Sequence, residues 1–159
     1  IPEAVLTFPP DHFAKNDLAI VTTDNNAVTR YIAGVLLATK AYDEATLNEE
    51  DTLSIIARWL ETGEESDLET LKKISGADTS ASVELSALSV PEELVSVHLD
   101  IINSLYNGAL SLQEIELTTQ NPQAGFFATA KFANYQSKKS KAIVALTDFY
   151  NKLTLSLNQ

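Results

Sequence analysis

One stretch near the C-terminus, from Pro122 to about Ser156, contains no residue that breaks a helix except Gly125. At 1.5 Å of rise per residue, a helix of about 35 residues is roughly 50 Å long. Apolar residues recur along it at intervals of three and four, which places them on one face. Other helices must cover that face, so the stretch predicts a helical bundle. The apolar face consists of Phe127, Ala130, Tyr135, Ala142, Leu146, Phe149 and Leu153.

The rest of the chain also has helical patterns, and five Gly and five Pro in 159 residues favour long helices over short strands. Asp24, Asn48 and Asn121 have side chains that cap helix starts, and Gly63 is placed to end a helix. Some segments stay open: residues 77–88 are a linker or a weak helix, and the polar run 137–141 either breaks the last helix or does not. The predicted helices cover residues 24–45, 49–62, 66–74, 90–116 and 122–156.

Residues 1–23 differ from the rest, because Pro2, Pro9 and Pro10 prevent a helix there. We therefore expect an extended N-terminal tail or connector over residues 1–23 and a single all-helical domain over residues 24–159. The expected fold is all-α, an elongated helical bundle built on a long antiparallel hairpin of the last two helices. The chain contains no methionine and begins with isoleucine, which predicts a signal peptide or membrane anchor ahead of it.

Charge is unevenly distributed along the chain. The formal net charge of −11 argues against nucleic acid or an anionic membrane surface as the main partner. After residue 116 the only acidic residue is Asp148, against five lysines. Two explanations stay open: the basic end neutralises acidic neighbours inside the bundle, or it meets the acidic face of another subunit in a head-to-tail assembly. No run of 18 apolar residues exists, so membrane contact is expected only through a missing N-terminal segment.

No pattern of residues predicts a catalytic, cofactor or metal site. The chain has no cysteine, and it lacks a Gly-rich phosphate loop, a Gly-x-Ser-x-Gly turn, a His-Glu-x-x-His pair and the spacing of an EF-hand. His98 lies in an apolar stripe, with Leu94 and Ile102 one turn away on either side. We expect a buried His98 that bonds to the backbone or to a neighbouring side chain. The acidic residues around Gly63 predict a solvent-facing surface.

Aromatic residues that one helical face cannot bury, and the lysines of the last helix, are the best candidates for contacts between subunits. Phe126 and Phe127 are adjacent, so one helix cannot point both rings inward. In an assembly, residues 1–23 would lie on a neighbouring subunit, and the lysines would face its acidic surface. The candidate interface residues are Phe8, Phe126, Phe132, Lys138, Lys139, Lys141 and Tyr150.

The segment from Val90 to Leu105 resembles a pattern in uncharacterised, membrane-anchored or secreted helical proteins of the Patescibacteria (candidate phyla radiation). In those proteins a Val-Pro start, a His-Leu pair and an Asn share one helix, and an Asx-Pro turn leads to another long helix. The resemblance covers residues 88–136; it implies export and an all-helical body, and it brings no known activity. The architecture is also similar to the helical minor pilins of type IV secretion systems. The matching positions are Pro91, His98, Leu99, Asn103, Asn121 and Pro122.

These patterns favour a non-enzymatic, extracytoplasmic structural protein, which would be a subunit of a surface filament, pilus or envelope complex. Its partners would be further copies of itself or other envelope proteins, and no cofactor is expected. The alternative is a monomeric binding or adaptor domain at the cell surface, with a groove between its helical halves. A third hypothesis is an enzyme of unfamiliar type, for which a buried carboxylate pair or a clustered His98 would be the sign.

Overall fold

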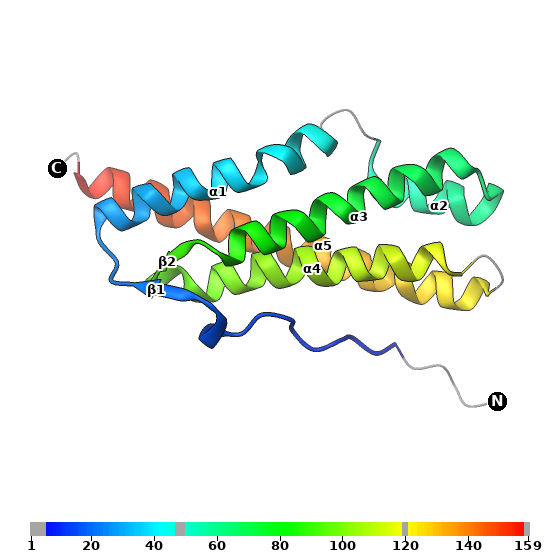
Figure 1. Cartoon of the computed structure of the whole chain (residues 1–159), viewed down its shortest axis with the longest axis horizontal. Coiled ribbons are helices and arrows are strands. Elements are labelled where there is room, and N and C mark those ends of the chain that lie inside the picture. Colours follow the sequence, from blue (N-terminus) through cyan, green and yellow to red (C-terminus); the bar gives the residue numbers. More distant parts are fainter. Residues whose placement is uncertain (1–5, 47–49, 119–120, 158–159) are drawn as a thin grey trace.

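A computed structural model describes residues 6–46, 50–118 and 121–157, which form an all-α fold (Figure 1). Two short strands, β1 (Ala19–Val21) and β2 (Ser89–Pro91), and two 3-10 turns, η1 (Lys15–Asp17) and η2 (Glu92–Leu94), accompany the helices. The α-helices are α1 (Asn25–Thr46), α2 (Thr52–Thr62), α3 (Glu65–Ser86), α4 (Val95–Glu116) and α5 (Pro122–Leu157).

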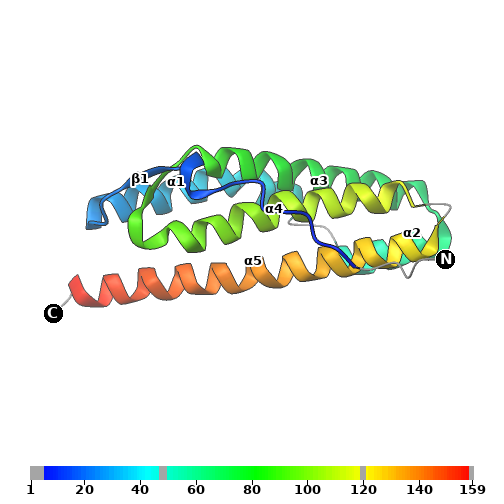
Figure 2. The ribbon, with the colours of Figure 1, turned by 90° about the horizontal axis from the view of Figure 1, so that it is seen from below.

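Helices α3, α4 and α5 lie side by side along the long axis of the molecule (Figures 1 and 2). At one end α1 packs on α3 and β2, and at the other end the shorter α2 packs on α3 and α5. The helix α5 runs the length of the molecule without a break at residues 137–141. The two ends of the bundle are therefore completed by different helices.

Several helix ends follow the signals in the sequence. Oδ1 of Asp24 and Oδ1 of Asn121 each accept a hydrogen bond from the backbone N–H three residues later, at 2.7 and 3.2 Å. Gly63 follows α2 with a φ of 68°, in the left-handed region. Both predicted caps and the predicted helix end are confirmed. The side chain of Asp51 caps α2; the predicted cap of that helix, Asn48, lies outside the described residues.

The predicted end of the third helix near Ile74 is wrong, because α3 continues through residues 77–86. Small and apolar side chains keep one face of this segment in contact with the core. Burial of that face stabilises the helix, although Ser, Thr and Gly are weak helix formers. The buried side chains beyond Ile74 are Ser75, Asp78, Ala81, Ser82 and Leu85.

A two-stranded parallel sheet stands where the helix predicted over residues 90–116 was expected to begin. Ile20 of β1 pairs with Val90 of β2, and the Val90 side chain is fully buried. Because this pairing holds the backbone of residues 89–91 extended, α4 begins only at Val95. Pro91 is compatible with the strand since it ends an edge strand. Within the predicted N-terminal tail, the described residues 6–23 contain the 3-10 turn η1 and the strand β1.

A paired charge joins α2 to α3. Arg58 donates through Nε and Nη2 to the two carboxylate oxygens of Asp67, at 2.8 and 2.6 Å. These hydrogen bonds hold the pKa of Asp67 below its usual range. Asp67 is therefore not part of the solvent-facing acidic surface that was expected around Gly63.

The core has two parts, one at each end of the bundle. The first lies under α1 and includes Tyr31, Leu85 and Ile102. The second lies under α2 and includes Trp59 and Phe132. Helices α3, α4 and α5 contribute to both parts, so they hold the two ends together.

The segment that precedes β1 lies on the body of the same chain. Residues 6–14, called the tail segment below, cross α4 and reach toward α5 (Figure 2). Phe13 packs against the first core cluster, and the Phe8 ring contacts the Tyr135 ring of α5 at a centroid distance of 6.0 Å. The tail segment is therefore held by contacts with its own helices.

Two glycines give opposite predictions for the same substitution. A methyl group added at Gly63 or at Gly76 meets no other atom within 4 Å. The effect of the substitution on stability therefore depends on the backbone conformation at each position. We expect Gly63→Ala to lower the free energy of unfolding by about 1 kcal/mol, because its φ is left-handed. Gly76→Ala lies inside α3, and we expect it to raise that energy by up to about 1 kcal/mol. Urea unfolding of both variants measures the difference, and shifts of the same sign would contradict the assignment of the α2 end and the α3 interior.

Candidate functional site

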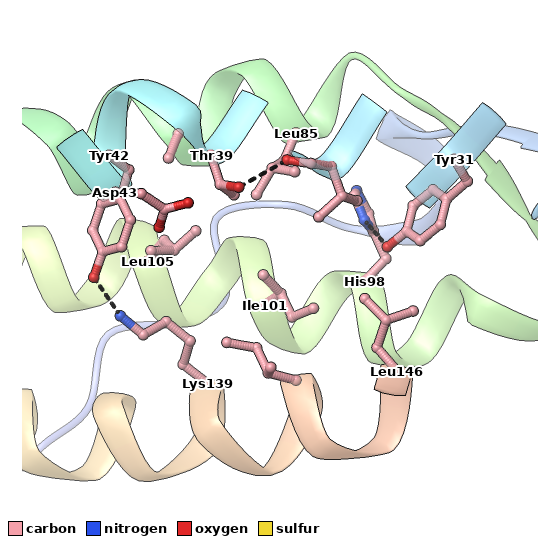
Figure 3. A pocket seen from close by; sticks show the side chains of 13 residues that line it. Tyr31, Thr39, Tyr42, Asp43, Leu85, His98, Ile101, Leu105, Lys139 and Leu146 are labelled. Carbon is pink, nitrogen blue, oxygen red and sulfur yellow. Dashed lines mark hydrogen bonds between the residues drawn. The ribbon is translucent and has the colours of Figure 1, made fainter. Parts of the chain in front are cut away.

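A cavity of about 330 Å³ lies between α1 and α5 (Figure 3). It exists because α1 packs on α3 while α5 packs on α4, which leaves a space between the two outer helices. Helices α3 and α4 form its floor. The lining residues are Tyr31, Val35, Thr39, Tyr42 and Asp43 of α1, Ala81 and Leu85 of α3, His98, Ile101 and Leu105 of α4, and Lys139, Ile143 and Leu146 of α5.

One end of the cavity is closed by Tyr31 and His98 (Figure 3). The Tyr31 hydroxyl lies 2.9 Å from Nδ1 of His98, and both side chains are buried. Burial lowers the pKa of His98 to about 4, against the opposing effect of the Leu85 backbone carbonyl, and it raises the pKa of Tyr31. Tyr31 therefore keeps its proton and the His98 imidazole is neutral, and one hydrogen bond joins the two side chains. The predicted buried histidine bonded to a neighbouring side chain is confirmed.

At the other end, Lys139 of α5 and Tyr42 of α1 bridge the cavity. The Lys139 ammonium donates to the Tyr42 hydroxyl at 3.0 Å and lies 5.1 Å from the centre of that ring. Asp78 of α3 is buried near this end; burial raises its pKa to about 6, and the charge of Lys139 acts in the opposite direction. No hydrogen bond to Oδ1 of Asp78 is present in the part of the chain that the structure describes. This end is polar and combines a cation, a phenol and a carboxyl group.

Between its two polar ends the cavity is apolar. Ile101 and Leu105 form the floor, and Val35 faces Ile143 and Leu146 across the gap. A cavity of a few hundred Å³ with an apolar wall and few polar groups is typical of sites that bind small molecules. The arrangement can therefore hold an apolar molecule and orient it by hydrogen bonds at one end.

The tail segment is held by a second group of side chains on α4 and α5. Oδ1 of Asn103 accepts the N–H of Phe13 at 2.8 Å, and Nδ2 of Asn103 donates to the carbonyl of Phe13 at 2.9 Å. The rings of His12 and Tyr106 are stacked, with centroids 3.8 Å apart. Asn103 thus binds the backbone of the tail segment, and Tyr106 binds its side chains.

The structure separates the candidate interface residues into different environments. Phe126 is 67% exposed, while Phe8 and Tyr150 are also exposed. Lys138 and Lys141 are exposed on α5. Two expectations need correction: Phe132 is fully buried between α5 and the second core cluster, so its ring is not available to another subunit, and Lys139 is bonded to Tyr42 in the cavity.

Helical periodicity in the sequence did not identify the cavity, which Tyr31 and Tyr42 of α1 line. Their separation of eleven residues, three helical turns, puts both hydroxyls on the same face and is the signal that could have marked its two ends. Asp78 was missed because it lies in the Ser- and Ala-rich segment whose structure stayed open. Lys139 is 97 residues from Tyr42, and no local pattern connects them.

Residues 6–46, 50–118 and 121–157 form neither a cluster of metal ligands nor a membrane-spanning helix. No three His, Asp or Glu side chains within these ranges gather closely enough to hold a metal ion. None of the helices in these ranges has the length and apolar character needed to cross a membrane.

The low pKa of His98 predicts that the contribution of this residue to stability is lost in acid. Its pKa falls from 6.5 in the unfolded chain to about 4 in the folded one, so the unfolded chain binds more protons between these values. The contribution of His98 is complete above pH 6.5 and decreases as pH falls toward 4, by about 3 kcal/mol in all. The contribution of Asp78 to stability has the opposite pH dependence. Burial raises the pKa of Asp78 to about 6, so its contribution is lost as pH rises through 6.

Proton NMR of a His12→Gln variant, in which His98 is the one remaining histidine, isolates this titration. We expect the ring signals of His98 to keep the neutral shifts at pH 6 and to titrate near pH 4. A midpoint close to 6.5 would contradict the buried, neutral Tyr31–His98 pair.

Comparison of the chain with protein-family models, with curated protein sequences and with solved structures finds no match in any of the three. The resemblance of residues 88–136 to helical proteins of the Patescibacteria stays a prediction. The support for a function therefore comes from the cavity and from the exposed surfaces.

Proposed function

We propose that this chain is a non-enzymatic binding domain whose cavity between α1 and α5 takes a small apolar molecule with a carboxylate or carbonyl group. The observation that supports this most is the cavity itself, which is apolar in the middle and polar at its ends. This is the binding or adaptor domain that the sequence analysis kept as its alternative.

The apolar part of the ligand would lie against α4 and α5. Ile101, Leu105 and Leu146 offer it buried aliphatic surface, and burial of such surface contributes about 25 cal/mol per Å² of apolar area. Ile143 is half-exposed, so it lies at the edge of the cavity, where a ligand would enter between α1 and α5.

The polar group of the ligand would lie at the Tyr42–Lys139 end. Tyr42 accepts a hydrogen bond from Lys139, so its own O–H is free to donate, and the ammonium has two further N–H groups. Both groups offer donors to a ligand oxygen, and the Asp43 carboxyl group, which lines the cavity beside Tyr42, offers acceptors to a ligand N–H or O–H (Figure 3). At the other end the Tyr31 hydroxyl and Nδ1 of His98 bond to each other, so neither needs a ligand group.

The proposal also includes the location of the protein. The domain would work outside the cytoplasm, secreted or anchored at the cell surface, as the resemblance of residues 88–136 implies. We also interpret the fold as a long antiparallel α4–α5 hairpin that supports the other helices, with residues 1–23 as its tail.

A subunit of a surface filament, pilus or envelope complex is the second candidate function. It is favoured by large apolar side chains that remain exposed on three parts of the surface. They lie on α1, around the turn between α4 and α5, and on the second half of α5, and such side chains often mark contacts between proteins. They are Leu36, Leu37, Leu117, Phe126, Val144 and Leu155.

Titration calorimetry of the 159-residue chain with decanoate and with decanol tests the first candidate. Decanoate carries the proposed acidic head, and decanol is its uncharged counterpart. We expect Lys139→Met to weaken decanoate binding about tenfold, which is about 1.4 kcal/mol, and to leave decanol binding nearly unchanged. Lys141→Met is the matched control, because it removes the same charge from an exposed position of α5; we expect less than a twofold effect.

A second variant, which fills the cavity, tests the site independently of whether Lys139→Met folds. Ala81 is buried in the cavity floor, and Ala81→Leu would occupy part of the space. We expect this variant to bind neither decanoate nor decanol while it keeps its helical circular dichroism. Absence of binding to the unmodified chain, or equal losses in Lys139→Met and Lys141→Met, would contradict the proposed site.

Light scattering of the purified chain over a range of concentrations tests the second candidate. A subunit that assembles would show a mass that rises above 17.3 kDa with concentration. We expect Phe126→Ser to lower that mass, because Phe126 is among the most exposed aromatic rings. A constant monomer mass would count against assembly and leaves the binding proposal intact.

A further inference from the structure

The polar end of the cavity between α1 and α5 contains a negative group as well as a positive one. Asp43 of α1 and Lys139 of α5 both line it, and the Asp43 carboxyl group lies beside Tyr42 (Figure 3). Asp43 follows Tyr42 in the chain, so the two side chains leave α1 about 100° apart. They therefore border the same space from two sides.

Asp43 and Lys139 are not paired with each other. Within the part of the chain that the structure describes, neither forms an ion pair. The Lys139 ammonium donates one hydrogen bond to the Tyr42 hydroxyl, which leaves it two further N–H groups. The Asp43 carboxylate accepts no side-chain or backbone donor of the described residues, so its oxygens are open to a ligand. A cation and an anion thus face one space.

The charges at this end do not favour a plain carboxylate. Lys139 is positive and Asp43 is negative, and the buried Asp78 carboxyl group also interacts with the Lys139 charge. The pKa of Asp78 is about 6, so this group is mostly ionised at pH 7. One more carboxylate adds repulsion, whereas a ligand with a carboxylate and an ammonium adds no net charge. A plain amine would leave the N–H groups of Lys139 unpaired.

The two charged side chains lie at different depths. Lys139 is half-buried, while Asp43 is exposed at the edge of the cavity. A ligand ammonium beside Asp43 would keep part of its water, so its desolvation costs little. A ligand carboxylate would lie deeper, where the donors of Lys139 and Tyr42 replace its lost water.

The apolar wall supplies a third point of contact. Leu105 of α4 and Leu146 of α5 are buried side chains that line the middle of the cavity. A ligand with its chain on this wall, its carboxylate at Lys139 and its ammonium at Asp43 is held at three points. Its mirror image cannot make all three contacts in the same way.

We infer that the ligand of this cavity is an α-amino acid with a large apolar side chain, whose carboxylate binds Lys139 and Tyr42 and whose ammonium binds Asp43. This inference rests on the proposed function and narrows it from carboxylates and carbonyl compounds to zwitterions. Asp43 is the residue that selects a ligand with an ammonium group. The apolar side chain of the ligand lies against Leu105 and Leu146.

Titration calorimetry of the 159-residue chain at pH 7 tests the inference with ligands of equal chain length. L-2-aminodecanoate carries both head groups, decanoate lacks the ammonium, and decylamine lacks the carboxylate. We expect L-2-aminodecanoate to bind about fivefold more tightly than either, which is the upper end of the effect of an exposed ion pair. We expect the affinities of the L and D enantiomers to differ by at least about threefold.

Two variants of α1 show whether Asp43 causes the preference. We expect Asp43→Ala to bind L-2-aminodecanoate and decanoate equally, with decanoate binding unchanged or stronger because a negative charge is gone. Glu44→Ala is the matched control, since it removes the same charge from the next position, where Glu44 pairs with Lys40 in solvent. We expect it to keep the preference. Alanine favours the helix at both exposed positions, so both variants should fold.

Failure of the inference and failure of the proposed function give different results. Equal binding of decanoate and L-2-aminodecanoate would overturn the inference and leave the cavity as a carboxylate site. A preference that persists in Asp43→Ala, or enantiomers that bind equally, would also overturn it. Decylamine that binds as tightly as L-2-aminodecanoate would show that the carboxylate takes no part. Absence of binding by all of these ligands would contradict the proposed function and the inference together.

Discussion

Burial of α4 on most of its circumference is the constraint on which the arrangement of the other segments depends. Thirteen of its 22 residues are buried, and five of these are the polar residues His98, Asn103, Ser104, Asn107 and Ser111. A helix so enclosed needs neighbours on every side. Helices α3 and α5 cover two sides, α1 closes the side of the cavity, and the tail segment crosses a further part of its surface (Figures 1 and 2).

Two of the buried polar side chains on α4 bond to the segments that cover them. His98 bonds to Tyr31 and so places α1, whereas Asn103 bonds to Phe13 and so places the tail segment. Because unpaired polar groups are costly in a core, these bonds select one position of each segment among many that would bury similar apolar area. Other buried polar groups of α4 do not place a segment: the Ser111 hydroxyl donates to the Asn107 carbonyl within α4, and the Asn107 side chain has no hydrogen bond within the described residues.

The two ends of the bundle differ because α1 and α2 meet α5 differently. The short helix α2 packs on both α3 and α5, and its Trp59 fills the space above Phe132. The longer helix α1 packs chiefly on α3, and only side chains such as Tyr42 and Lys139 reach across to α5. The α1 end of the molecule therefore keeps a cavity of about 330 Å³ between the two outer helices.

The sequence by itself determined what depends on residues a few positions apart. The length of α5, the caps at Asp24 and Asn121, the end of α2 at Gly63 and a buried His98 follow from helical periodicity and local hydrogen bonds. Tertiary structure decided the continuation of α3 to Ser86, the pairing of β1 with β2, and the meeting of Tyr42 with Lys139. The partners in these last two contacts lie 70 or more positions apart, and no local pattern in the sequence indicates which distant partner a side chain will contact. Burial and strand pairing across the fold outweigh the intrinsic helix and strand propensities of the residues.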